Sequence, residues 1–540
     1  MDIFAVNTKP YLDQSFGTSG LRKKSDVFNQ ENYLENIIQS IFDTLEGFEG
    51  QTLVIGGDGR YGNNKAIQTI IKMAIANQFG HIIVGQNGLL STPATSHIIA
   101  STKAFGGILL TASHNPAGKN GDFGIKYNIA TGGPAPESLT NRFVERMHTI
   151  DHYWMIHMDD IDLSQVGEQN IGTTLIEVID PVEDYTHYME KIFDFDAIRE
   201  LFKSGFKITF DAMNAVTGPY AKHIFEDVLG AEKGSVIRGT PLVDFGGIHP
   251  EPNLTYAKEL VDLAYSENAP DLCAASDGDG DRYMILGKSF FVNPADSLAI
   301  LAENMEKIPF YKGRFYGAAR SMPTGGAVDL VCQKMKKDCY QTPTGWKFFG
   351  SLLENKKISI CGEESFGAGS FHVMEKDGLW AILCWLNILA VTKRKPEELV
   401  RDMWENYGRI YNLTVNYNTD SAKKAKHLMD SLSAKLISLP HQEVNSLTIS
   451  NAQFFNYTDP TNQIVSTHQG ILLDFGPNDQ AMIRLSGTVS SGATVKVYLH
   501  HKDHNSSLSS EDALTPLFDA IQNILNIKKY LGKNVEIVKT

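Results

Sequence analysis

A serine at the end of an apolar stretch is the first residue that could carry covalent chemistry. Residues 107–112 predict a buried strand, which leads to Ser113, His114 and Asn115 before Pro116 stops it. A serine at such a tip is expected to combine a fixed backbone with a solvent-exposed hydroxyl, as a nucleophile requires. An isolated Ser-His pair is more often an ordinary strand-to-loop turn, so this assignment depends on the rest of the sequence.

Asp277, Asp279 and Asp281 form a second group with chemical potential. On an extended backbone, this spacing places three carboxylates on one side, where a hard divalent cation can take one oxygen from each. Mg²⁺ is the expected ion. An acidic turn without a cation is disfavoured because carboxylates this close repel one another.

Other sites with similar motifs are excluded by single residues. An EF-hand needs glycine and glutamate where this loop has Arg282 and Lys288. A Walker loop ending in Gly287-Lys288-Ser289 would need its leading glycine at Arg282. An aspartyl-phosphate enzyme using Asp277 would need Thr or Val in place of Asp281.

A third group lies near the C-terminus, in the stretch 484–492, which combines a cation, hydroxyls and glycines. Glycines allow backbone N–H groups to close around an anion, and hydroxyls and arginine complete its shell. This stretch is therefore expected to be a phosphate-binding turn.

Three segments share a pattern in which an apolar strand passes through a polar turn into an amphipathic helix, as expected of βα units. Each strand with its polar turn, and the helix that follows, are 53–60 with 66–76, 208–214 with 220–229, and 315–321 with 327–335. Downstream of each unit, another strand runs into a loop dense in polar side chains, namely 111–116, 276–282 and 361–367. This layout indicates an internal triplication whose loops could converge on one cleft.

The sequence after about residue 405 has a different pattern. A polar helical stretch, 422–435, precedes strand-like runs at 470–475, 481–486 and 493–499, which predict an antiparallel α+β unit. The expected fold class is α/β, with three similar mixed α/β domains and a smaller C-terminal α+β domain around a central cleft. The expected domains, 1–185, 186–303, 304–404 and 405–540, carry in turn the serine loop, the metal loop, a sugar-binding loop and the phosphate-binding loop.

Composition limits the class of partner. The net charge of −14 over 540 residues disfavours nucleic acids and anionic membranes, but it allows small anionic substrates. No secretory signal is visible, and the longest apolar window, 379–391, is too short for a membrane span and predicts a buried helix. Five scattered cysteines without a Cys-x-x-Cys pair favour a cytoplasmic setting. The oligomeric state stays open, with a monomer favoured.

A series of short motifs resembles the α-D-phosphohexomutase superfamily, and most closely the phosphoglucomutases. The motifs occur in family order at 17–22, 111–116, 121–126, 277–282, 343–347, 362–367, 375–378 and 484–488. The resemblance implies a four-domain, heart-shaped protein in which one loop from each domain lines a central cleft.

The resemblance also implies an activity. Ser113 would be carried as a phosphoserine, and Mg²⁺ would be held by Asp277, Asp279, Asp281 and a phosphate oxygen on Ser113. Glucose 1-phosphate and glucose 6-phosphate would interconvert through a bound glucose 1,6-bisphosphate that turns over between two phosphoryl transfers. Such transfer needs in-line positioning and charge neutralisation, which a metal ion and Arg282 can supply.

Carrying the motifs over residue by residue gives the expected site. Ser113, His114 and Lys376 are the expected catalytic residues. Whether His114 and Lys376 act as acid or base, or only hydrogen-bond the phosphoserine and clamp charge, stays open. Glu363 and Ser365 would bind the 3- and 4-hydroxyls of the sugar. The other expected substrate contacts, besides Ser113 and Lys376, are Thr18, Ser19, Arg22, Lys126, Asp281, Arg282, Thr344, Gly345, Arg484, Ser486, Gly487, Thr488 and Lys496.

Two positions depart from the family pattern. Val489 stands where a small residue is usual, and Lys496 replaces an arginine, which keeps the charge but loses the bidentate fork. These two departures are expected to affect the affinity for phosphate, not the type of reaction. The histidine-rich stretch 500–504 is interpreted as a solvated loop after a strand.

A phosphatase and a catalytically silent scaffold are the competing interpretations. A phosphatase has no need of a second phosphate site or of a loop that binds sugar hydroxyls. A silent relative is expected to have lost Ser113 or a metal aspartate, whereas this sequence keeps them all. The sequence therefore favours an active mutase.

Overall fold

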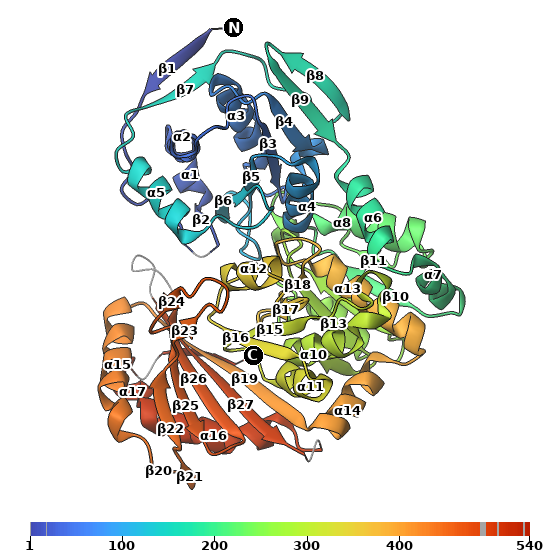
Figure 1. Cartoon of the computed structure of the whole chain (residues 1–540), viewed down its shortest axis with the longest axis vertical. Helices are drawn as coiled ribbons and strands as arrows, with labels where there is room; N and C mark the ends of the chain where they lie inside the picture. The colour runs from blue at the N-terminus through green and yellow to red at the C-terminus, as the bar shows by residue number, and fades with distance from the viewer. Residues whose placement is uncertain (1, 18, 487–492, 505–506, 533–534, 540) are drawn as a thin grey trace. The chain divides into compact units, whose positions relative to one another are not determined.

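The computed structural model describes residues 2–17, 19–486, 493–504, 507–532 and 535–539, and Figure 1 labels its elements. The chain divides into two compact units. Unit 1 comprises Met1–Pro294, Asn304–Tyr316 and Gly345–Glu397, and unit 2 comprises Ala295–Glu303, Gly317–Thr344 and Glu398–Thr540. Within the described ranges, no helix is long and apolar enough to cross a membrane.

Unit 1 begins with a seven-stranded sheet that has helices on both faces. Its strands are β2 (Leu21–Lys24), β3 (Thr52–Gly57), β4 (His81–Gly85), β5 (Gly106–Leu110), β6 (Asp122–Ile129), β8 (Gly167–Ile171) and β9 (Thr174–Ile179). Its helices are α1 (Ser25–Phe28), α2 (Tyr33–Thr44), α3 (Asn63–Ala76), α4 (Thr92–Thr102) and α5 (Glu137–Met147). A separate antiparallel pair joins β1 (Ile3–Asn7) to β7 (His152–Ile156).

The strand order in this sheet is β2-β6-β5-β3-β4-β9-β8. β5, β3, β4 and β9 run parallel, and β6 turns back antiparallel to β5 (Figure 1). Residues of α2, α3 and α5 share one hydrophobic core with β3 and β5, whereas Ile99 of α4 packs against Gly107 on the other face. Because helices cover both faces of the sheet, its central strands must be apolar on both faces.

A second sheet of unit 1 has the order β11-β10-β12-β13-β14. Its strands are β10 (Ile208–Asp211), β11 (Val236–Ile237), β12 (Leu272–Ser276), β13 (Tyr283–Gly287) and β14 (Phe290–Val292). β10 is parallel to β11 and β12, and β13 is antiparallel to β12. The surrounding helices are α6 (Pro181–Ile192), α7 (Phe195–Lys203), α8 (Thr217–Ala221), which continues as π-helical turns over Lys222–Val228, and α9 (Lys258–Ala264).

The last part of unit 1 contains an antiparallel pair, β17 (Ile360–Gly362) and β18 (Ala368–Ser370), with α12 (Lys347–Glu354) and α13 (Gly378–Thr392). The predicted buried helix is confirmed, because α13 is buried from Gly378 to Ala390. β5, β12 and β17 each lead into a polar loop and then into an antiparallel strand, β6, β13 and β18. The repeated layout that the sequence predicts is thus observed.

Unit 2 contains the parallel pair β15 (Gly317–Ser321) and β16 (Asp338–Thr342), with α10 (Pro294–Asn304), α11 (Ala327–Met335) and α14 (Pro396–Tyr407). Its larger sheet has the order β22-β25-β26-β27-β19-β28 and is antiparallel, as predicted. The strands are β19 (Arg409–Thr419), β22 (Asn451–Phe454), β25 (Ile471–Phe475), β26 (Asp479–Ser486), β27 (Ala493–Asp503) and β28 (Glu536–Lys539). The helices α15 (Ala422–Lys435), α16 (Ser510–Leu525) and α17 (Ile527–Tyr530) share its core.

The interpretation of residues 500–504 as a solvated loop is wrong. β27 pairs with β19 along its whole length, so the strand continues to Asp503. His500 is buried, and its Nε2 lies 3.0 Å from the carbonyl oxygen of Pro323. Burial lowers the pKa of His500 to about 4, so the ring is neutral at pH 7. The strand extends this far because its partner β19 is equally long, which the local sequence does not reveal.

A buried carboxyl group in unit 2 has no part in the predicted site. Asp296 of α10 is 3% exposed, and Trp404 Nε1 donates to its Oδ2 at 3.1 Å. Its Oδ1 has no hydrogen-bond partner among the described residues. Burial raises the pKa of Asp296 from 3.8 to about 7, so the carboxyl group is mostly protonated below about pH 7 in the folded protein.

Asp296→Asn is therefore expected to change how stability depends on pH. The folded-state pKa is the higher one, so the contribution of Asp296 to stability is complete below its unfolded pKa and is lost as pH rises through the folded pKa. Urea unfolding of the parent should show a loss of about 3 kcal/mol between about pH 5 and about pH 8 that the variant lacks. Asp430→Asn, at an exposed position on α15, is the control. Parallel pH profiles for the parent and Asp296→Asn would contradict the assignment.

Candidate active site

Ser113 follows β5 and is held by a buried network of hydrogen bonds. Its backbone is left-handed, with φ 51°, a conformation that non-glycine residues adopt when their surroundings hold them. The Ser113 amide donates to Thr111 Oγ1 at 2.7 Å, and the Thr111 hydroxyl donates to Asp58 Oδ2 at 2.7 Å. Arg60 donates to both carboxylate oxygens of Asp58 and, at 2.9 Å, to the Ser113 carbonyl. The tip of the strand is thus fixed from both sides.

The predicted solvent exposure of Ser113 is wrong, because the residue is only 3% exposed. The aspartate loop packs against its backbone so closely that a Cβ on Gly278 would lie 2.4 Å from the Ser113 carbonyl oxygen. The Ser113 hydroxyl donates to Asp277 Oδ2 at 2.9 Å and lies 3.4 Å from His114 Nδ1. Tertiary packing brings this loop over the serine, and a strand-tip pattern alone does not predict it.

His114 and Lys376, the two predicted acid-base candidates, have different charge states. Burial, followed by Arg282 and Arg22, lowers the pKa of His114 well below its ordinary value, so the imidazole is neutral. Burial alone would lower the pKa of Lys376, but the carboxylates of Asp281, Glu363 and Asp277 together outweigh burial, and the pKa is raised. Lys376 Nζ lies 3.1 Å from Asp281 Oδ2. A neutral imidazole can accept a proton, and an ammonium can donate one.

The three aspartates lie in a tight turn, and the prediction of an extended backbone is wrong. Asp277 Oδ1 accepts the amides of Asp281 and Arg282 at 3.0 and 3.1 Å. Gly280 has φ 81°, which allows the loop to double back. One oxygen from each of Asp277, Asp279 and Asp281 nevertheless lies within 4.8 Å of the others. The turn therefore brings together the carboxylates that the sequence singled out.

This cluster fits a hard divalent cation. Burial, and then repulsion by Asp281 and Asp279, raises the pKa of Asp277 well above its ordinary value. Asp279 Oδ1 and Asp281 Oδ1 are buried without a hydrogen-bond partner in the described part of the chain. Buried carboxylate oxygens that lack protein donors are ligands that such a cation satisfies.

The third polar loop, after β17, lies beside the aspartate loop. Gly367 forms a β-bridge with Arg282, which joins the two loops directly. Glu363 is buried, its Oε1 accepts the Gly345 amide at 3.3 Å, and its Oε2 lies 4.0 Å from Lys376 Nζ. Burial raises the pKa of Glu363, with Lys376 opposing the shift. Ser365, in the same loop, is half-buried.

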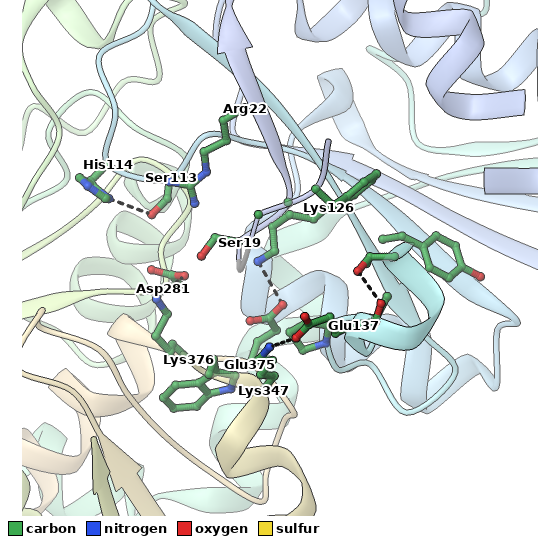
Figure 2. Close-up of a pocket in the computed structure, with 18 of the residues that line it drawn as sticks. Ser19, Arg22, Ser113, His114, Lys126, Glu137, Asp281, Lys347, Glu375 and Lys376 are labelled. Carbon is green, nitrogen blue, oxygen red and sulfur yellow. Dashed lines mark hydrogen bonds and ion pairs between the residues drawn. The ribbon is translucent and has the colours of Figure 1, made fainter. Parts of the chain in front are cut away.

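A cavity of about 410 Å³ in unit 1 brings many predicted residues together. Those that line it and are labelled in Figure 2 are Ser19, Arg22, Ser113, His114, Lys126, Asp281 and Lys376. Arg282 also lines it. The cavity is large enough for a drug-sized or sugar-sized ligand. Three further predicted residues contact residues that line the cavity. Asp277 contacts Ser113, Asp279 belongs to the same carboxylate cluster as Asp281, and Glu363 lies beside Lys376.

Other predicted residues lie elsewhere in the chain. The Thr344 hydroxyl oxygen is buried and lacks a hydrogen-bond partner within the described ranges. In unit 2, Arg484 and Ser486 belong to β26, so the predicted turn begins later than the sequence suggests. Arg484 pairs across the sheet with Lys496 of β27, which places two cations side by side. Thr18, Gly487, Thr488 and Val489 lie outside the described residues.

Several residues that hold the site in place were not singled out from the sequence. Asp58 and Arg60 fix the Ser113 backbone, and Thr92 Oγ1 donates to Asp279 Oδ2 at 2.7 Å. The position of Asp58 and Arg60, in a polar turn after the first predicted strand, is a signal that could have identified them. Thr92 carries no such signal, because it opens an ordinary helix.

Two glutamates hold cationic residues of the cavity. Glu375 Oε1 lies 3.1 Å from Lys126 Nζ and accepts from Asn128 Nδ2 at 3.0 Å. Glu251 Oε1 lies 3.3 Å from Arg282 Nη1. Because the partners are distant in the sequence, no local pattern could have predicted these ion pairs.

Family models match nearly the whole chain. Those described as "Phosphoglucomutase/phosphomannomutase, alpha/beta/alpha" domains I, II and III match residues 13–154, 183–289 and 293–407. The model described as "Phosphoglucomutase-1, C-terminal domain" matches residues 409–535.

Individual proteins are similar over the same length. The phosphoglucomutase of Rhizobium radiobacter is 51% identical over 541 residues, and the match covers 100% of each chain. Phosphoglucomutase-1 of Homo sapiens is 45% identical over 560 residues, again covering 100% of each. The solved structure of the Paramecium exocytosis-sensitive phosphoprotein pp63/parafusin, described as a phosphoglucomutase in its open form, has a TM-score of 0.93 and 42% identity, covering 100% of this chain and 99% of that one. The chain therefore belongs to the phosphoglucomutase family.

Proposed function

We propose that this chain interconverts glucose 1-phosphate and glucose 6-phosphate, with Ser113 as the carrier of the phosphoryl group. The observation that carries this proposal is the hydrogen bond of 2.9 Å between Ser113 Oγ and Asp277, which joins a rigidly held hydroxyl to a cluster of three carboxylates. Relatives named phosphoglucomutase, at 45–51% identity over the full chain, support the same reaction.

In this proposal Asp277, Asp279 and Asp281 would hold the metal ion, together with a phosphate oxygen on Ser113. Mg²⁺ suits the site because it prefers a few carboxylate oxygens and phosphate. When bound, it neutralises negative charge on the transferred phosphoryl group. Arg282 supplies further positive charge, since its guanidinium lies within 4.0 Å of Asp277 and Asp281.

The phosphoryl transfer breaks the bond between Ser113 Oγ and phosphorus and forms one between a sugar hydroxyl oxygen and phosphorus. Neutral His114 is the proposed acceptor of the proton that the sugar hydroxyl loses, and charged Lys376 is the proposed donor of the proton that the leaving Ser113 Oγ takes up. Glu363 and Ser365 bind sugar hydroxyls, while Arg22 and Lys126 bind phosphate oxygens.

The product of the first transfer is glucose 1,6-bisphosphate, which carries two phosphates. It turns over in the site and returns the other phosphate to Ser113. Arg484, Ser486 and Lys496 are proposed to bind the phosphate that is not reacting, together with Thr344, Gly345 and, outside the described residues, Thr18, Gly487 and Thr488. The cross-strand pairing of Arg484 with Lys496 supports this role, since adjacent cations favour an anion between them.

An intact-mass measurement followed by turnover tests the proposal. The purified protein is expected to carry a fraction of one phosphate and to convert glucose 1-phosphate once a trace of glucose 1,6-bisphosphate is added. Mannose 1-phosphate in a parallel reaction defines the sugar preference. Release of inorganic phosphate without glucose 6-phosphate would favour a phosphatase and overturn the proposal.

Glu363→Gln is expected to weaken catalysis in both directions, because the same carboxylate accepts from sugar hydroxyls in either orientation of the substrate. A lost charge-assisted hydrogen bond of about 1.5–3 kcal/mol corresponds to a fall in kcat/KM of about 10- to 150-fold. The measurement is kcat/KM with glucose 1-phosphate and with glucose 6-phosphate. Glu200→Gln, at an exposed position on α7, is the control. Parent-like values for Glu363→Gln would remove this residue from the site.

A further inference from the structure

The described residues that line the cavity include three lysines, and each ammonium lies against a carboxylate. The pairs are Lys126 with Glu375, Lys376 with Asp281, and Lys347 with Glu137. The carboxylate partners differ greatly in exposure. The side chains of Glu375 and Asp281 are 2% and 5% exposed, whereas that of Glu137 is 67% exposed. The Lys347–Glu137 pair is therefore the one that a ligand can separate at least cost.

The two residues of this pair begin two different helices. Glu137 is the first residue of α5 and Lys347 the first residue of α12, and both line the cavity. A carboxylate is favoured at a helix N-terminus and an ammonium is disfavoured there. Lys347 thus stands where an anion is preferred, and Glu137 supplies that anion in the structure.

The position of the pair in the cavity suggests which ligand group it would meet. Figure 2 shows Lys347 and Glu137 on the side of the cavity away from Ser113 and His114. When a sugar phosphate reacts at Ser113, its other end occupies the far side. A phosphate there brings up to two negative charges and three acceptor oxygens, whereas Glu137 brings one charge.

A partly exposed ion pair contributes little stability, because water and salt screen it. A buried pair is costly to separate, because each partner is left charged and unsolvated. A phosphate is thus expected to replace Glu137 at Lys347 while leaving the pairs of Lys126 and Lys376 intact.

We propose that Lys347 is a further phosphate-binding residue of this cavity, and that Glu137 is a built-in competitor which occupies its ammonium until a sugar phosphate binds. The inference rests on the proposed function, since the ligand it names is the phosphate farther from Ser113 on that substrate. It adds to the proposed function a residue for substrate binding and a contact that lowers affinity in the free protein.

Two single substitutions distinguish this role from a merely structural one. Glu137→Gln frees Lys347 and is expected to lower the KM for glucose 1-phosphate about threefold. Lys347→Met removes a charged donor and is expected to raise it about tenfold. If the pair only tied α5 to α12, both variants would break the same contact and shift KM in the same direction. The two variants are therefore expected to shift KM in opposite directions. A shift of KM in the same direction in both variants would overturn the proposal.

The double variant provides a second test. If Glu137 acts only through Lys347, Glu137→Gln in the Lys347→Met background should have no further effect on KM. A threefold gain that persists without Lys347 would contradict the proposal. Lys72→Met and Asp160→Asn are matched controls, because that surface pair has side chains 21% and 67% exposed, against 29% and 67% for Lys347 and Glu137.

A binding measurement separates this inference from the proposed function. Glucose 6-phosphate is titrated calorimetrically into the Ser113→Ala protein and into the same protein carrying either substitution, so no turnover is needed. Opposite shifts in Kd would support the inference even if the parent lacked mutase activity. Unchanged Kd values in both variants would overturn it even if the parent were fully active.

Discussion

Ser113→Ala is expected to abolish the interconversion of glucose 1-phosphate and glucose 6-phosphate, with turnover reduced about 10⁴-fold or more. The physical reason is that the phosphoryl group has no other covalent carrier in the proposed reaction. The covalent phosphate should disappear from the intact mass of the protein at the same time. Coupled assays in both directions and mass spectrometry measure the two effects.

The Ser113→Ala variant is expected to fold, because the network that fixes this residue uses its backbone. The Ser113 amide and carbonyl bond to Thr111 and Arg60, and alanine keeps both groups. Among the described residues, the polar contacts of the hydroxyl are with Asp277 and His114. Ser101→Ala, on the exposed side of α4, is the control. Mutase activity that survives in Ser113→Ala, with the protein folded, would remove the central claim.

Loss of the divalent cation should have the next largest effect. Excess chelator and Asp279→Asn are each expected to lower turnover about 10³-fold, because without a tightly held cation the remaining buried carboxylates would face the phosphoryl group without a neutralising charge. Added Mg²⁺ should restore the chelated parent but not the variant. Calorimetric titration with Mg²⁺ gives a readout independent of turnover, and Asp279→Asn should bind it more weakly.

Asp262→Asn, at an exposed position on α9, is the control for this experiment. It should keep parent-like turnover and the parent response to chelator. Full activity of the parent in excess chelator would contradict the metal assignment. Parent-like Mg²⁺ affinity in Asp279→Asn would show that the aspartate cluster is not the binding site.

Local sequence patterns were sufficient to predict the strands that lead into the polar loops and to single out candidate side chains in those loops. Apolar strands followed by polar loops predicted β5, β12 and β17, because burial on both faces makes a parallel strand continuously apolar. The chemistry of the loops was also local, since three aspartates close in sequence must lie close in space whatever the fold. Ser113 and Asp277 could thus be singled out as candidates from the order of residues alone.

The detailed geometry of the loops was not local. Asp277, Asp279 and Asp281 were expected on an extended backbone, yet they occupy a turn. The turn depends on Gly280 and on hydrogen bonds that backbone amides donate to the Asp277 carboxylate. Ser113 was expected in solvent, yet the loop at Gly278 covers its backbone. Both differences arise because strand patterns describe which residues are buried within an element, not which loop packs over its end.

The pairing of charges in the site depends entirely on tertiary contacts. Lys126 meets Glu375, 249 positions away, and Lys347 meets Glu137, 210 positions away. Such pairs form because strands and helices from distant parts of the chain end at the same cavity, and no sequence period encodes that distance. The sequence specified a serine, three aspartates and several cations as candidate site residues. Folding then determines which lysines of the cavity are paired with buried carboxylates and which one is paired with an exposed carboxylate.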